Sequence, residues 1–318
     1  MGYKPTYTWP NPAFPFRIYY SGEACRIFII ENIQHNWIWL NAYHKKIKDS
    51  DIFFVYCGWY HSEDFAREAE EIFAELSLKK ENFFFMYNCQ EEMQNFTKYG
   101  FIGDIINQNA WLDENITMEI MENEIKIYDA IYVARLSAFK RHYLASNVSN
   151  LALVAGINHG RPLIENVPKH IYKNEAPLTP AGVCQKINQS RCGLILSETE
   201  GACFSSSEYL LCGVPVVSTY SHGGRDVWYD EYNSLVVPPD PDAVSDAVHF
   251  FKNNPRDPYK IRADHIAKAR QYRSKFIDLL GVFFREYGVS IDPRQYFEDN
   301  FFHKLRRSHI PDFDSIFG

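Results

Sequence analysis

The stretch ETEGACFSSSEYLLCGVPVVST, residues 198–219, joins a turn of small residues to a short helical pattern and a valine-rich strand. An apolar run at 193–197 predicts a strand directly before it, so Gly201, Ala202 and Cys203 follow the carboxyl end of that strand. Small side chains let a ligand approach the backbone, and the first N–H groups of a helix are available to a phosphate. The order of strand, turn and helix therefore indicates a parallel α/β sheet that binds its ligand at the carboxyl ends of its strands.

The rest of the chain repeats this alternation of apolar strands and amphipathic helices. In the first part of the chain, the sequence predicts strands at 26–30, 52–56 and 83–86 and a helix at 63–80. In the second part, it predicts five strands, at 128–133, 151–155, 193–197, 214–218 and 234–237. Helices are predicted at 138–149, 180–190, 204–212, 240–252 and 261–287, and Asp240-Pro241 is a typical helix start. We therefore expect two α/β domains with parallel sheets of the Rossmann type.

The composition is that of a folded globular protein. Of the 318 residues, 46% are hydrophobic, which is enough for two domain cores. The net charge of −7 argues against a general basic field for nucleic acid. Seven cysteines without a CxxC pair favour free thiols and a cytoplasmic location, and they argue against disulfides or structural zinc. The N-terminal residues lack the apolar core of a signal peptide, and no apolar run reaches the ~18 residues of a membrane span.

Four charged residues stand at positions where the predicted sheet would bind a nucleotide. Arg135 and Lys140 lie five positions apart across a strand-to-helix turn, so both cations can bind a diphosphate. Glu208, in the predicted helix, can accept hydrogen bonds from both hydroxyls of a ribose. Glu200, at the strand end, would face the group beyond the phosphates. Solvated surface charge is the alternative interpretation of all four residues.

Five short motifs occur in order on these predicted elements. They are ARLSAFKR (134–141), Ser197 with Glu200 and Glu208, CGVPVV (212–217), HGGRD (222–226), and NSLVVP (233–238) followed by Asp240-Pro241. This series resembles the donor-binding domain of the retaining nucleotide-sugar glycosyltransferases of the GT-B fold, in particular the large family 4. The resemblance covers residues 131–250. It implies two Rossmann-like domains that face a cleft, with C-terminal helices that cross back to the first domain.

The resemblance implies a role for each candidate residue. Arg135 and Lys140 would hold the donor diphosphate and offset the charge of the departing nucleotide. Glu208 would bind the ribose. Glu200 would engage the donor sugar together with the backbone of Gly201, Ala202, Cys203 and Phe204. Such enzymes generally need no metal and no cofactor, so we expect a metal-independent, retaining transferase that positions its donor and stabilises its leaving group.

The sequence departs from the family patterns at several glycines. Ala134 and Arg141 replace the two glycines of the Gly-Arg-Leu-x-x-x-Lys-Gly motif, and Ala202-Cys203 replaces the Phe-Gly of Ser-x-x-Glu-Gly-Phe-Gly. Ser234 stands for the glycine of the Asn-Gly-Leu segment. Because alanine and cysteine are small, we expect the backbone to stay accessible to a phosphate, while the donor-sugar pocket differs.

The N-terminal part of the chain is shorter than in the family. We expect a small acceptor-side domain at 1–117, a donor domain at 118–284 and a return of 285–318 to the first domain. On the acceptor side, His61 follows a predicted strand, and Gly22 belongs to a poor counterpart of the family's glycine-rich first loop. A structural or surface histidine is the alternative interpretation of His61.

Together these expectations describe an enzyme that moves a sugar from a nucleotide-diphosphate sugar to an acceptor hydroxyl of a glycan, a glycolipid or another acceptor. A non-catalytic nucleotide-sugar-binding subunit or scaffold is the alternative from another class. A transferase acting on modified DNA bases is a third interpretation, which the basic Lys304–Arg307 favours and the acidic balance opposes. Trp37–Leu40 predicts a buried helix, with attachment at the periphery of a membrane as its alternative. The nucleotide, the sugar, the acceptor and the choice between a monomer and a homodimer stay open.

Overall fold

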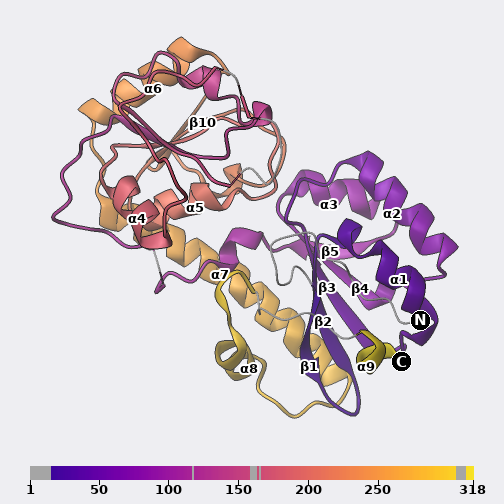
Figure 1. Ribbon diagram of the computed structural model, residues 1–318. Helices are drawn as coiled ribbons and strands as arrows, with labels where there is room; N and C mark the ends of the chain where they lie inside the picture. Colours follow the sequence, from indigo (N-terminus) through magenta and orange to yellow (C-terminus); the bar gives the residue numbers. More distant parts are fainter. Residues whose placement is uncertain (1–15, 117, 158–162, 165, 306–312) are drawn as a thin grey trace. The chain divides into compact units, whose positions relative to one another are not determined.

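The computed structural model describes residues 16–116, 118–157, 163–164, 166–305 and 313–318. It divides the chain into two units (Figure 1). One consists of the described residues of Met1–Trp111 and Arg270–Gly318, and the other of those of Leu112–Ala269. The sequence suggested junctions at 117 and 284 instead. Helix α7 (Pro258–Glu286) is continuous across the second junction, so no break in the helical pattern marks it.

The first unit is built on a five-stranded sheet in the order β1-β2-β3-β4-β5. The strands are β1 (Phe16–Ser21), β2 (Arg26–Glu31), β3 (Asp51–Tyr56), β4 (Phe83–Tyr87) and β5 (Ile102–Ile105). Strands β2 to β5 are parallel, whereas β1 runs antiparallel to β2 and was not predicted. Helices α1 (Trp37–Tyr43), α2 (Glu63–Glu75), α3 (Gln90–Thr97) and α9 (Phe313–Phe317) cover one face, and α8 (Pro293–Asn300) lies with the end of α7 on the other.

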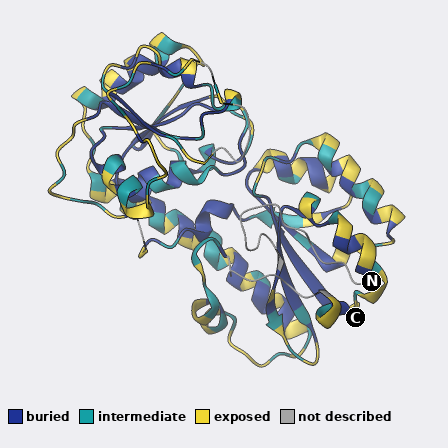
Figure 2. Cartoon of the chain, viewed as in Figure 1, coloured by how far each residue is buried: buried dark blue, intermediate teal, exposed yellow. Residues whose placement is uncertain are grey.

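Alternating side chains of this sheet fill two separate cores. Phe28 and Phe53 stack at 5.0 Å between ring centroids in the core under α1 to α3, and their neighbours Ile29 and Phe54 pack against α7. Because helices cover both faces, every residue of β3 is buried (Figure 2). Trp39 and Leu40 of α1 belong to the first of these cores, as the predicted buried helix requires, whereas Ile38 between them and Trp37 is 65% exposed.

The second unit is an all-parallel sheet in the order β11-β10-β9-β6-β7-β8. The strands are β6 (Ala130–Val133), β7 (Leu151–Val154), β8 (Tyr172–Lys173), β9 (Gly193–Ile195), β10 (Val216–Thr219) and β11 (Ser234–Val237). Helices α4 (Pro180–Asn188), α5 (Phe204–Leu211) and α6 (Pro241–Asn253) connect or follow them. The strand order reverses between β6 and β9, which makes the carboxyl ends of these two strands the topological switch point of the sheet.

Local sequence signals explain most of these elements. Asp240 caps α6 by accepting hydrogen bonds from the N–H groups of Asp242 and Ala243, as its Asp-Pro start predicts. The predicted helix at 138–149 is wrong. Two short 3₁₀ turns, η5 (Ala138–Lys140) and η6 (His142–Ala145), replace it, because Arg141 between them has a left-handed backbone with φ 49°.

Three further expectations concern the whole chain. All seven cysteines are free thiols, as predicted, and six of them are buried. Among the described residues, no helix combines the length and apolarity needed to cross a membrane. Of the basic stretch 304–307, Arg306 and Arg307 lie outside the described residues.

Candidate active site

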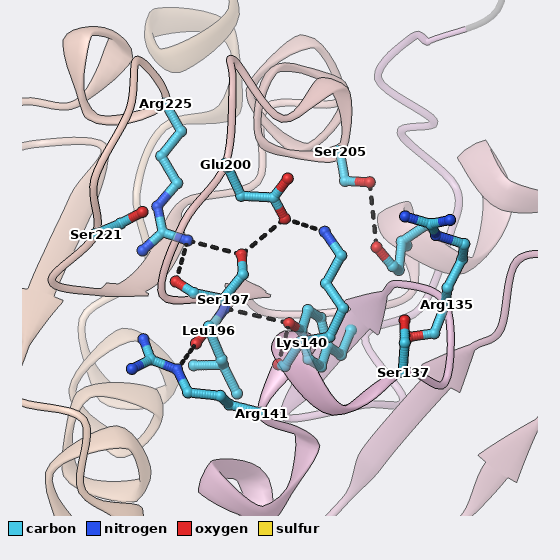
Figure 3. A network of polar contacts seen from close by, with 12 residues as sticks. Arg135, Ser137, Lys140, Arg141, Leu196, Ser197, Glu200, Ser205, Ser221 and Arg225 are labelled. Carbon is cyan, nitrogen blue, oxygen red and sulfur yellow. Dashed lines mark hydrogen bonds and ion pairs between the residues drawn. The ribbon is translucent and has the colours of Figure 1, made fainter. Parts of the chain in front are cut away.

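The turns after β6 and β9 bring two of the predicted site residues together at the switch point of the second unit. Lys140, in the turn after β6, forms an ion pair through Nζ with Oε1 of Glu200, in the turn after β9 (Figure 3). The side chains are 12% and 6% exposed, so water screens the pair weakly. The structure therefore places a cation and a carboxylate in contact at the sheet edge where ligands of this architecture bind.

A second set of contacts holds the Glu200 carboxylate from its other side. The hydroxyl of Ser197 donates to Glu200 Oε1 at 2.7 Å, and Nη1 of Arg225 donates to the same Ser197 hydroxyl at 3.0 Å. Arg225 is fully buried. Ser197 and Arg225 both belong to motifs of the sequence, but nothing local in the sequence indicates that their side chains meet or what they do.

The backbone of the Glu200 turn is held by the loop after β10. The N–H of Glu200 donates to the His222 carbonyl at 3.0 Å, and the N–H of Gly224 donates to the Gly201 carbonyl at 2.7 Å. Gly223 between them has φ 108°, and a Cβ there would lie 1.6 Å from the Glu200 carbonyl oxygen. Glycine is therefore required at 223 for this loop to pack on the turn.

At two positions where the motifs of the resembled family have glycine, this chain has another residue but keeps the backbone conformation that favours glycine. Arg141 has φ 49° and Cys203 has φ 56°, both in the left-handed region. The Arg141 side chain gains contacts from this position, because its Nε donates to the Leu196 carbonyl at 2.6 Å and its Nη2 donates to the Thr219 hydroxyl at 2.9 Å. Arg141 thereby ties the turn after β6 to the carboxyl ends of β9 and β10.

The aromatic ring of Phe139 lies next to both predicted diphosphate ligands. The guanidinium carbon of Arg135 is 5.5 Å from the ring centroid, and Nζ of Lys140 is 5.0 Å from it. These distances are within the range of cation–π attraction. Phe139 therefore helps to gather the two cations of the turn after β6, a contact that their spacing in the sequence did not reveal.

Helix α5 carries the remaining donor-side candidates. Cys203 is its N-cap, Phe204 is its first residue, and Glu208 lies about one turn in with a half-buried side chain. The hydroxyl of Ser205 donates to the Val133 carbonyl at 3.1 Å, so the first turn of α5 is fixed to the end of β6. Burial, reinforced by the Glu200 carboxylate, raises the pKa of the Cys203 thiol to about 11. This thiol is therefore neutral and a poor nucleophile at pH 7.

The buried side chains of Tyr132 and His142 pack in and beside the turn after β6. The Tyr132 hydroxyl donates to the Lys140 carbonyl at 2.6 Å and accepts from the Leu196 N–H at 3.4 Å. His142 packs on the Tyr132 ring at 4.7 Å, and its pKa falls to about 4 because burial, with a smaller effect of Lys140, disfavours the charged imidazole. These residues add rigidity without adding charge at neutral pH.

The two acceptor-side candidates lie at opposite edges of the first unit's sheet. His61 follows β3 at the carboxyl edge, but its side chain is 2% exposed and packs between the rings of Phe65 and Phe96. Burial lowers its pKa to about 3, so the ring is neutral. Gly22 lies in the β1–β2 turn, next to the amino end of β2. Neither position presents a polar group at the carboxyl edge, where ligands of parallel sheets bind.

Comparisons with known proteins agree with this geometry. Residues 183–272 match the family described as glycosyl transferases group 1. The structure is similar to that of HepE from Anabaena in complex with UDP, with a TM-score of 0.54, 14% identity, and coverage of 80% of this chain and 78% of that chain. It is also similar to sucrose-phosphate synthase from Thermosynechococcus elongatus, with a TM-score of 0.53, 14% identity, and coverage of 83% and 74%. A comparison with curated protein sequences finds no match. The chain therefore has the GT-B fold of two Rossmann-like α/β domains, and its residues 183–272 match the group 1 glycosyltransferases.

Proposed function

We propose that the chain is a retaining glycosyltransferase that transfers a sugar from a nucleotide-diphosphate sugar to an acceptor hydroxyl. The contact between Lys140 and Glu200 carries this proposal. The two residues come from the two turns that flank the switch point, and they are the residues that a donor diphosphate and a donor sugar would require there. The match of residues 183–272 to glycosyl transferases supports the same reaction class.

In this proposal the cations of the turn after β6 bind the donor diphosphate. Lys140 exchanges the Glu200 carboxylate for a phosphate oxygen, and Arg135, which also lies near the Phe139 ring, provides the second cation. As the bond between the sugar and the diphosphate breaks, negative charge grows on the leaving phosphate. Two positioned cations lower the energy of that charged state, so the proposal requires neither a metal ion nor another cofactor.

The turn after β9 and helix α5 bind the rest of the donor. Glu208 accepts hydrogen bonds from the ribose hydroxyls, and the backbone from Gly201 to Phe204 faces the phosphate and the sugar. Glu200, once released from Lys140, accepts hydrogen bonds from hydroxyls of the donor sugar and orients it for transfer with retention. The acceptor is a hydroxyl of a glycan or glycoconjugate.

A thermal-shift panel of UDP-, GDP-, dTDP- and ADP-sugars tests the donor class. UDP-glucose comes first, because structures of HepE are described in complex with UDP and with UDP-glucose. A donor present at about 100 times its Kd should raise the free energy of unfolding by ~2.7 kcal/mol. Stabilisation by none of the four donor classes would contradict the proposal.

Two substitutions locate the site and separate binding from chemistry. Glu208→Ala should weaken binding of the nucleotide, because the ribose loses its acceptor. Lys140→Ala should lower turnover more than affinity, because its charge matters most when the diphosphate leaves. If both variants behave like the parent, the site lies elsewhere.

The anomeric configuration of the product tests retention. NMR spectra of the sugar released from UDP-α-glucose should show the α-anomer first, whereas a first β-product would contradict a retaining mechanism. Tight nucleotide binding without turnover for any donor and acceptor would instead favour the non-catalytic subunit.

A further inference from the structure

Arg225 is a buried cation whose contacts converge on the Glu200 turn. It is fully buried, and its nearest carboxylate, Asp226, is 3.2 Å from its Nε and partly exposed. Its remaining hydrogen bonds go to the carbonyl and hydroxyl of Ser197, at 2.8 and 3.0 Å, and to the Thr219 carbonyl. Burying a guanidinium group carries a large desolvation cost before its contacts form, so this position needs an explanation beyond simple packing.

The chemistry of these groups sets the direction of each hydrogen bond. A guanidinium group has only donors, so the Ser197 hydroxyl must accept from Arg225. The hydroxyl proton is then directed to Oε1 of Glu200, 2.7 Å away. Arg225 therefore fixes the rotor of Ser197, and Ser197 in turn fixes one oxygen of the carboxylate (Figure 3).

Both side-chain partners of Glu200 in the described part of the chain bind the same oxygen. Oε1 accepts from Ser197 and pairs with Lys140, whereas Oε2 makes no hydrogen bond with any residue in the described part of the chain. Oε1 is therefore anchored by the protein, whereas Oε2 is available to a ligand. Tyr132 and Cys203 are the other titratable groups near this carboxylate, and burial raises the pKa of both, so neither competes for it as an anion.

We propose that Arg225 and Ser197 are positioning residues that hold Oε1 of Glu200 and thereby aim Oε2 at a hydroxyl of the donor sugar. This inference rests on the proposed function and extends it. When a donor diphosphate draws Lys140 away, the Ser197 hydroxyl becomes the remaining anchor of Oε1. The Arg225–Ser197 pair therefore matters for recognition of the sugar and for its transfer, and not for binding of the nucleotide.

Calorimetric titrations with UDP and UDP-glucose test this division. Ser197→Ala removes the hydroxyl but keeps the bonds of Arg225 to the carbonyls of residues 197 and 219. The variant should bind UDP like the parent, lose about tenfold in UDP-glucose affinity, and lose about 10- to 100-fold in kcat. Ser197→Thr, which restores a hydroxyl, should recover most of both losses.

Ser190→Ala is the matched control. Ser190 is equally buried and donates its hydroxyl to the Lys186 carbonyl at 2.8 Å, at the amino end of β9, so its loss should change none of these values. Arg225→Lys keeps the positive charge but loses the pair of hydrogen bonds to the carbonyl and the hydroxyl of Ser197. It should therefore lose UDP-glucose affinity and kcat as Ser197→Ala does. In the double variant the loss should not exceed the larger single loss, because both residues act through one hydroxyl.

The outcomes separate this inference from the function on which it rests. If the parent binds neither UDP nor UDP-glucose, both are overturned for this donor. If the parent binds UDP-glucose more tightly than UDP and Ser197→Ala keeps this preference, the positioning role is wrong and the proposed function stands. Equal losses of UDP and UDP-glucose affinity in Ser197→Ala, with a lower Tm, would reveal a merely structural role and would also overturn it.

Discussion

The β9–α5 turn of the second unit and the β3–α2 turn of the first unit have the same position in two similar sheets. Each follows the carboxyl end of a buried parallel strand, and each carries a buried side chain that the sequence nominated for the site, Glu200 or His61. Their surroundings differ. Glu200 contacts Lys140 and Ser197, with Arg225 beyond, whereas the rings of Phe65 and Phe96 enclose His61.

The comparison indicates that its polar partners make a buried polar residue a candidate for chemistry. Donors from its own turn and from two other segments of the chain converge on the Glu200 oxygen or on the hydroxyl that binds it, which offsets the cost of burying a carboxylate. His61 is kept neutral by apolar rings, and neither ring nitrogen has a hydrogen-bond partner among the described residues. Burial at a strand end is common to both, so the polar partners distinguish the candidate site from the core.

The largest expected difference concerns Gly223, in the loop that packs on the Glu200 turn, and Gly58, in the His61 turn. Gly223→Ala should cost about 3 kcal/mol or more in the free energy of unfolding, because the new Cβ would meet the Glu200 carbonyl oxygen in the backbone. Gly58→Ala, in the His61 turn, should cost less, because the atoms nearest to the Cβ would belong to the side chain of Asn32 and not to the backbone. Urea unfolding of both variants measures this, and equal costs would contradict the tight packing at Gly223.

The next effect is the pH dependence of stability that His61 gives the first unit. The pKa of His61 is about 3 in the folded chain and about 6.5 when the chain unfolds. Its contribution to the free energy of unfolding is therefore complete above pH 6.5 and is lost as the pH falls toward 3. At pH 5 this loss amounts to about 2 kcal/mol. His61→Phe should remove it and should raise the stability relative to the parent more at pH 5 than at pH 7.5.

Denaturation of the parent and His61→Phe at the two pH values provides the check. The buried carboxyl of Glu92 has its pKa raised to about 8 by burial, so it lowers stability as the pH rises from about 4.5 to about 8. That contribution is present in both proteins and cancels in their difference. The same pH slope in parent and variant would show that His61 is not held neutral.

The smallest effects are expected where cysteine and arginine occupy glycine-like backbone positions. Cys203→Gly relieves about 1 kcal/mol of left-handed strain and adds a similar entropic cost, so stability should change by less than about 1 kcal/mol. Arg141→Gly relieves the same strain but loses the hydrogen bonds to Leu196 and Thr219, so it should destabilise by about 2 kcal/mol. Thermal unfolding compares the two, and a reversed order would contradict the role of the Arg141 side chain.

Much of the fold could be predicted because strands buried on both faces leave continuous apolar runs in the sequence. The GT-B architecture is confirmed, and most helices appear near their predicted positions. Three observed strands lie outside the predicted ranges. Strands β5 and β8 have four and two residues, too few for a clear pattern, and β1 is a half-buried antiparallel edge strand in a segment rich in turn residues.

The wrong helix prediction at 138–149 shows that some local conformations depend on residues far away in the sequence. Arg141 interrupts the helix, and its conformation is stabilised by contacts with Leu196 and Thr219, 55 and 78 positions away. The Lys140–Glu200 contact, 60 positions apart, and the Arg225–Ser197 contact, 28 positions apart, have the same character. Motifs could nominate Lys140 and Glu200, but the roles assigned to them stay predictions. The partners that orient them depend on the tertiary structure.

Donor turnover by the parent, Glu200→Gln and His61→Phe tests the central claim most directly. The released nucleoside diphosphate is measured with the donor that stabilises the parent most. Glu200→Gln should lower kcat by about 10²- to 10³-fold while nucleotide affinity holds or increases, because Lys140 is freed for the diphosphate. His61→Phe should turn over like the parent. Parent-like turnover by Glu200→Gln, or a comparable loss in His61→Phe, would contradict the assignment of the chemistry to the β9–α5 turn.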